Sequence, residues 1–218
     1  IKQVREFLNV ATLSVLTRGD MAVSFRSSAK ELTEINTVKA NTMVQIAINR
    51  AVKRTVPRFN KAKFEEVVAY ALTLTRNHEN FYPLIRDAFC EAGVIFVILP
   101  NLSGSKINGA TKKIGNSVML MVNDRRFNAD TFWFTLFHEI GHIMNGDYGI
   151  SFEKEAGVQE EAADHYAEDA LIPPVRYQEF IRDNDKFDLQ TITDFANQIE
   201  RDPGIVLGRL QNDGKVGF

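Results

Sequence analysis

The sequence predicts an α+β fold in which helices surround a small sheet. Apolar residues recur at helical spacing over residues 4–15 and 37–54. Two almost wholly apolar stretches, residues 94–99 and 118–122, have the composition of strands buried on both faces. From residue 130 onward the pattern is helical again. Together these patterns indicate a sheet in the middle of the chain with helices before and after it.

Composition narrows the class of protein. The chain has 218 residues, enough for one good-sized domain, and its formal net charge of -2 gives no general attraction to nucleic acid or an anionic membrane. We find no apolar run of about 20 residues and no signal peptide, so we expect a cytoplasmic protein without a membrane partner. Cys90 is the only cysteine. Any metal must therefore be bound by histidine and carboxylate.

The first part of the chain predicts helices and a boundary. Pro57 ends the first helical region, and we expect residues 1–58 to form an N-terminal helical segment. Because the chain begins at Ile1, directly on a helical pattern, this segment is expected to be the remainder of a longer protein. Asn60 is the expected N-cap of the next helix.

The central part predicts the sheet. A helix over about residues 81–92 should end at Gly93, which leads into the strand at 94–99. Further strand is expected over residues 110–123, with a turn at Gly115-Asn116.

The remainder predicts five helices. Asp130 is the expected N-cap of a helix that ends at residues 145–147. A second helix should follow Gly157 and stop at Pro173-Pro174. The other three are expected over residues 175–183, 188–200 and 204–211.

The candidate chemistry lies in the sequence His138-Glu139-Ile140-Gly141-His142. Four residues of α-helix turn through about 400°, so the two histidines project about 40° apart and can bind one ion. Glu139 can reach a water on the open side of the metal, where zinc lowers the pKa of that water. An ordinary amphipathic helix with two incidental histidines is the alternative. The position of the motif on a predicted helix after a buried strand favours metal binding over this alternative.

A catalytic zinc usually takes three protein ligands, so the third must come from elsewhere. The helix after Gly157 carries Glu160, Glu161, Asp164 and His165. Glu160 is the preferred ligand and Glu161 the alternative, while Asp164, one turn after Glu160, can orient a histidine. Acidic residues in the first turn of a helix are also favoured by the dipole alone. His165 points away from the Glu160 and Asp164 face.

These residues resemble the ImmA/IrrE family of zinc metallopeptidases, in particular members fused behind a helix-turn-helix of the XRE repressor type. The resemblance covers roughly residues 92–214. It is carried by the aromatic-rich metal helix at 132–143, the glutamate helix at 160–167 followed by 171–174, and the ending at 195–196 and 203–211. Ala162 departs from the family, because many relatives have an acid there. The choice between Glu160 and Glu161 as the third ligand therefore stays open.

The resemblance implies a zincin-like minimal peptidase domain, with a small sheet packed on the HExxH helix. We assign this domain to residues 59–186 and a C-terminal helical tail to 187–218. The resemblance further implies one Zn²⁺ per chain, bound by His138, His142 and Glu160, with Glu139 as catalytic base. The family's best-understood members cut a partner transcriptional repressor. DNA contact would come only through the N-terminal domain that is missing here.

Three hypotheses follow for function. The first is a cytoplasmic zinc-dependent endopeptidase that cleaves a DNA-binding repressor and so regulates transcription. The second is an antitoxin-like or transcriptional regulatory protein with a toxin partner, in which the metal senses or stabilises. The third is a purely structural zinc, which is disfavoured because such sites are usually closed by four protein ligands and no fourth is evident.

Overall fold

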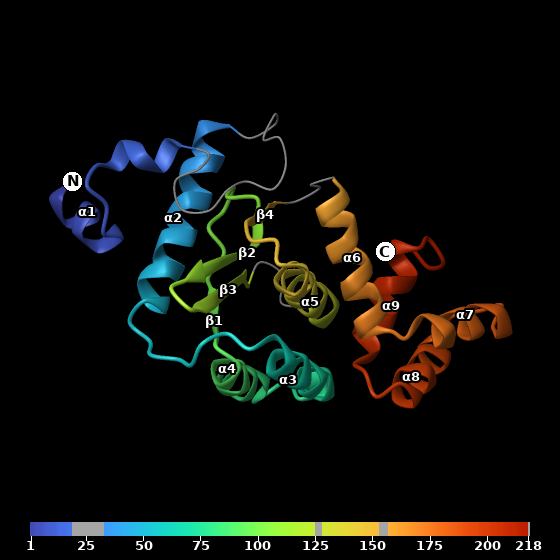
Figure 1. The fold of residues 1–218 in the computed structure, drawn as a ribbon. Coiled ribbons are helices and arrows are strands. Elements are labelled where there is room, and N and C mark those ends of the chain that lie inside the picture. The colour runs from blue at the N-terminus through green and yellow to red at the C-terminus, as the bar shows by residue number, and fades with distance from the viewer. Residues whose placement is uncertain (19–32, 125–127, 153–156, 218) are drawn as a thin grey trace.

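The computed structural model describes residues 1–18, 33–124, 128–152 and 157–217, and within them the fold is α+β as predicted (Figure 1). None of the described helices combines the length and apolar character needed to cross a membrane. The helices are α1 (Lys2–Leu8), α2 (Glu34–Ala51), α3 (Lys61–Thr73), α4 (Phe81–Glu91), α5 (Ala129–Asn145), α6 (Val158–Leu171), α7 (Pro174–Asp183), α8 (Leu189–Gln198) and α9 (Pro203–Asn212), with 3₁₀ turns at Leu13–Thr17 and Leu74–Arg76. The strands are β1 (Val94–Leu99), β2 (Ile107–Ile114), β3 (Ser117–Asn123) and β4 (Ile150–Phe152).

The four strands form one mixed sheet in the order β1-β3-β2-β4. Strands β1 and β3 are parallel, whereas β2 pairs with both β3 and β4 in the antiparallel sense. The turn between β2 and β3 lies at Gly115-Asn116, as predicted, and Gly115 has a left-handed φ of 59°. Strand β4 was not predicted, because three residues are too few for a period of two to be recognised.

Helices cover both faces of the sheet (Figure 1). On one face, α2 packs through Ala40, Val44 and Ala47 in a buried cluster with alternate residues of the strands, among them Ile95 and Met119. The intervening strand residues face the other way, into a larger core shared with helices α3 to α9. The central strands are therefore buried on both faces, which explains their unbroken apolar sequence.

An N-cap and a glycine act at helix ends as the sequence predicts. The Asn60 side chain accepts a hydrogen bond from the Lys63 backbone N–H at 3.1 Å and so caps α3. Gly93 has a φ of 81° between α4 and β1, which suits a residue without a side chain.

Some predicted helix boundaries are wrong. The helical pattern over residues 4–15 is interrupted, because Asn9 adopts a left-handed φ of 53° and ends α1. Asparagine tolerates this conformation better than most residues. Helix α5 has Asn128 rather than Asp130 as its N-cap. Asp130 lies in the first turn instead, where its charge still suits the positive end of the helix dipole.

Helix α9 returns to pack on the start of α5 and next to the end of α6. A Cβ on Gly208 would lie 2.6 Å from the Cβ of Asp130, so α9 approaches α5 closely there. Arg201, just before α9, donates to the backbone carbonyl of Leu171 at 3.1 Å, and Arg209 pairs with Glu168 of α6 at 3.1 Å. The C-terminal helices thus hold α5 and α6 in their relative positions.

Candidate metal centre

Helix α5 brings His138 and His142 together, one turn apart on the same face. Their Nε2 atoms lie 3.0 Å from each other, and both side chains are buried. The helix ends at Gly146, whose φ is 76°, and the next residue, Asp147, donates its backbone N–H to the carbonyl of His142 at 3.0 Å. Gly146 thus stops α5 as predicted and reverses the chain beside the second histidine.

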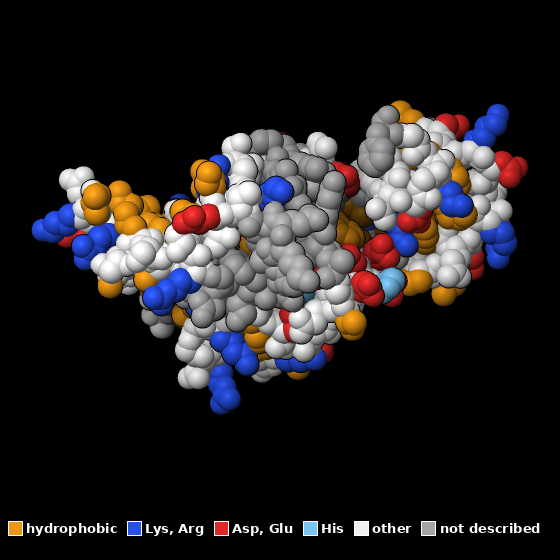
Figure 2. Space-filling model, turned by 90° about the horizontal axis from the view of Figure 1, so that it is seen from above, with side chains coloured by type: hydrophobic (Ala, Val, Ile, Leu, Met, Phe, Trp, Pro, Cys, Tyr) orange, Lys and Arg blue, Asp and Glu red, His pale blue; other side chains and the backbone are white. Residues whose placement is uncertain are grey.

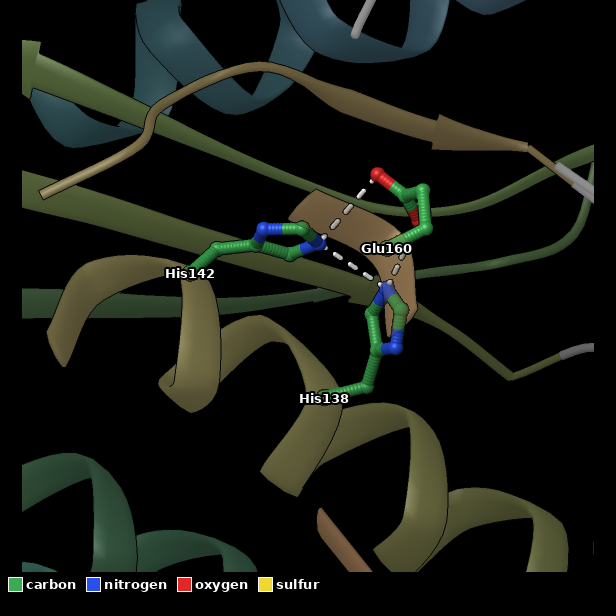
Figure 3. A group of neighbouring side chains, drawn as sticks. All are labelled: His138, His142 and Glu160. Carbon is green, nitrogen blue, oxygen red and sulfur yellow. Dashed lines mark hydrogen bonds and ion pairs between the residues drawn. The ribbon is translucent and has the colours of Figure 1, made fainter. Parts of the chain in front are cut away.

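Glu160 in the first turn of α6 completes a three-residue cluster with the histidines (Figure 3). Its Oε2 lies 3.1 Å from Nε2 of His138, and its Oε1 lies 3.4 Å from Nε2 of His142. Glu160 is 4% exposed, whereas the alternative ligand Glu161 is exposed to solvent and is not part of the cluster. Because α6 presents only one of the two adjacent glutamates to α5, Glu160 is the one available to a metal.

The spacing of the donor atoms fits a small tetrahedral cation. Two nitrogens bound to zinc at about 2.0–2.1 Å in tetrahedral geometry stand about 3.3 Å apart. The separations of 3.0, 3.1 and 3.4 Å among the His138, His142 and Glu160 donors are close to this value. Two imidazoles and a carboxylate are also a ligand set that zinc accepts. A buried group that can bind one metal ion is therefore present, and its composition suits zinc.

A carboxylate holds the outer nitrogen of each histidine. Asp164, one turn after Glu160 on α6, lies 2.8 Å from Nδ1 of His138. Asp147 lies 3.0 and 3.1 Å from Nδ1 of His142 through its two oxygens. A carboxylate at Nδ1 accepts its proton and turns the Nε2 lone pair inward, towards the space that a metal would occupy. Both rings are therefore oriented for binding.

The sequence predicts the role of Asp164 but assigns Asp147 only to the end of a helix. Asp147 directly follows the helix-ending Gly146, and in this structure the Asp147 carboxylate lies on His142. In the sequence alone, this arrangement cannot be distinguished from an ordinary helix end.

The electrostatics of the cluster favour positive charge at its centre. Burial opposes protonation of His138, but its hydrogen bonds with Asp164 and Glu160 outweigh burial and raise its pKa to about 10. Burial likewise opposes ionisation of Glu160, but hydrogen bonds from His138 and His142 outweigh it and lower the pKa of Glu160 to about 2. A metal cation could take the place of the proton on His138, since the same carboxylates attract both.

Removing either orienting carboxylate should weaken metal binding without removing a ligand. We expect Asp147→Ala and Asp164→Ala each to lower zinc affinity by about 10–100-fold, because the histidine rings lose the partner that fixes their direction. Competition with a chromophoric chelator measures the change. Asp169→Ala, on an exposed part of the same helix α6, is the control. Unchanged affinity in both variants would contradict an orienting role.

Close packing of α5 and α6 makes the cluster feasible. A Cβ on Gly141 would lie 3.1 Å from the Cα of Ala163 and from the Cβ of Tyr166. The small residues at 141 and 163 therefore let the two helices approach closely enough for Glu160 to reach both histidines. The other two histidines lie outside the cluster: His165 is exposed on α6, and His78 pairs with Asp202 at 3.0 Å.

Glu139 occupies the side of α5 that faces the sheet. It is fully buried, and its carboxyl group lies against Gly109 of β2. The residue predicted to act as a base is thus next in the chain to His138 and held in a confined space.

Searches of protein-family models, curated proteins and solved structures return no match to this chain. The interpretation of the site therefore depends on the residues and geometry described above.

Proposed function

We propose that this chain is a zinc-dependent endopeptidase of regulatory type, with a zincin-like arrangement of sheet and metal helix. The observation that carries the proposal is the buried His138, His142 and Glu160 cluster, with Glu139 adjacent to it in the chain and an orienting carboxylate on each histidine. The substrate class comes from the resemblance to the ImmA/IrrE family, and we propose a DNA-binding repressor.

The number of ligands favours catalysis over a structural role. Among the described residues, the cluster has three members that could donate to a metal. Structural zinc sites are usually closed by four protein ligands, whereas catalytic sites have three and leave a position for water or substrate. Three ligands with a neighbouring carboxylate are therefore what hydrolysis requires.

The residues of this chain would have separate roles in hydrolysis. A bound zinc ion would lower the pKa of a water molecule towards neutrality and polarise the scissile carbonyl. Glu139 would accept the proton of that water and later donate it to the leaving amine. Asp147 and Asp164 would keep His138 and His142 in their binding orientation throughout.

Metal removal tests the proposal. We expect the purified protein to contain one zinc per chain and to cleave fluorescently labelled casein or a DNA-binding repressor of the XRE type. Treatment with a strong chelator should abolish cleavage, and stoichiometric zinc should restore it. Metal content is measured by atomic emission and cleavage by gel electrophoresis. A zinc-loaded protein that cleaves neither substrate would contradict the proposal and favour the antitoxin-like or regulatory hypothesis.

A further inference from the structure

We propose that Gly109 is a positioning residue for Glu139, because the absence of a side chain on β2 creates the space that the glutamate occupies. The catalytic meaning of this inference rests on the proposed function, but the contact itself does not. A Cβ built on Gly109 would lie 2.5 Å from Oε1, 2.6 Å from Cγ and 2.7 Å from Cδ of Glu139. All three of these nearest atoms belong to the one side chain predicted to act as base.

Backbone conformation does not require a glycine at this position. Gly109 does not have a left-handed φ, and it lies within β2 at a register irregularity between Ile107 and Gly109 in the pairing with β4. Glycine weakens strand interiors and is found there at bulges and where a ligand or another chain segment approaches closely. Because the φ of Gly109 is not left-handed, the irregularity does not itself require a glycine, whereas the close approach of Glu139 leaves no room for a side chain.

The strand cannot easily move away to make room for a larger residue. Gly109 pairs with Val122 of β3 on one side and with Ser151 of β4 on the other. The next residue, Ala110, is fully buried in the core on the α2 face of the sheet. Since β2 is held from three directions, a methyl group at residue 109 must displace the glutamate rather than the strand.

The displacement should be specific to the glutamate. Oε1, Cδ and Cγ all stand within 2.7 Å of the added carbon, so the whole carboxyl arm of Glu139 would have to move. His138, His142 and Glu160 contact one another between α5 and α6, and none of them is among the nearest atoms to Gly109. Gly109→Ala is therefore expected to disturb the base while leaving the metal ligands in place.

A double-mutant cycle on the metal-free protein tests the contact without any need for activity. We expect Gly109→Ala to lower the thermal midpoint by about 3–10 °C when Glu139 is present, because the added methyl overpacks the site. In the Glu139→Ala background, where the arm is absent, the same substitution should change the midpoint by less than about 2 °C. An equal loss in both backgrounds, or failure of the double variant to fold, would overturn the proposal.

Hydrolysis then tests the consequence for catalysis. In zinc-loaded protein, Gly109→Ala should lower kcat at least about tenfold with zinc content unchanged, since a displaced base no longer accepts the proton. Gly217→Ala is the matched control, because a Cβ there meets nothing within 4 Å. Wild-type kcat with an unchanged pH profile in Gly109→Ala would overturn the positioning role. If the wild type cleaves nothing, the proposed function fails, and the stability cycle still decides whether Gly109 makes room for Glu139.

Discussion

The variant Glu139→Gln is expected to cleave the substrate about 10²–10⁴-fold more slowly than the wild type while binding zinc equally well. The amide has nearly the shape of the carboxylate and fits the same space beside Gly109, but it cannot accept a proton from water. Glu139 is fully buried on the side of α5 that faces β2, and the candidate metal ligands lie between α5 and α6. Binding and catalysis should therefore separate in this variant.

The measurement for Glu139→Gln is kcat for cleavage together with zinc content on the same preparation. Glu161→Gln serves as the control, because it makes the same chemical change at an exposed position outside the cluster. Cleavage by Glu139→Gln at the wild-type rate would rule out Glu139 as the base. Loss of cleavage with intact gene regulation in cells would instead support the antitoxin-like or regulatory hypothesis.

Glu160→Ala is expected to lower zinc affinity more than about 100-fold, because removal of a carboxylate that only orients a ligand already lowers affinity about 10–100-fold. The two Glu160 oxygens lie 3.1 and 3.4 Å from Nε2 of His138 and His142, so its loss removes one of three candidate ligands and the negative charge that faces both Nε2 atoms. Two histidines alone provide too few ligands for the usual zinc site.

Glu161→Ala is the matched control for this prediction, since it changes the neighbouring residue of the same helix turn. Chelator competition measures the affinity of both variants, and circular dichroism shows whether each is folded. Glu160→Gln, which preserves the volume of the buried side chain, separates loss of the ligand from loss of packing. Zinc retained by Glu160→Ala and lost by Glu161→Ala would reverse the assignment.

Short-range patterns predicted much of the fold. Apolar composition identified β1 and the centre of β3, and α6 begins directly after Gly157 and ends before Pro173-Pro174, as predicted. These elements follow from contacts within a few residues, such as periodicity, capping and the left-handed glycines at 93 and 146. The predictions failed where the local signal was weak or ambiguous, as at Asn9, at the start of α5 and in the three residues of β4.

The metal motif itself is a local feature, and the sequence alone determined it. Helical geometry requires that residues 138 and 142 share a face, whatever the rest of the chain does. The identity of the third residue was not determined in this way, since Glu160 and Glu161 are both acidic and both lie in the first turn of a helix. The two residues differ in direction, because successive residues of an α-helix project about 100° apart around its axis.

Tertiary structure decided which of the two glutamates faces α5, and it decided the remaining contacts of the site. The close approach of α6 to α5 at Gly141 buries Glu160 against the histidines and leaves Glu161 in solvent. The same packing places Asp164 on His138, while the Gly146 turn places Asp147 on His142. Gly109 reaches Glu139 only because β2 pairs between β3 and β4 under α5. These contacts join segments whose mutual distance depends on the packing of the whole core, and local sequence patterns contain no information about it.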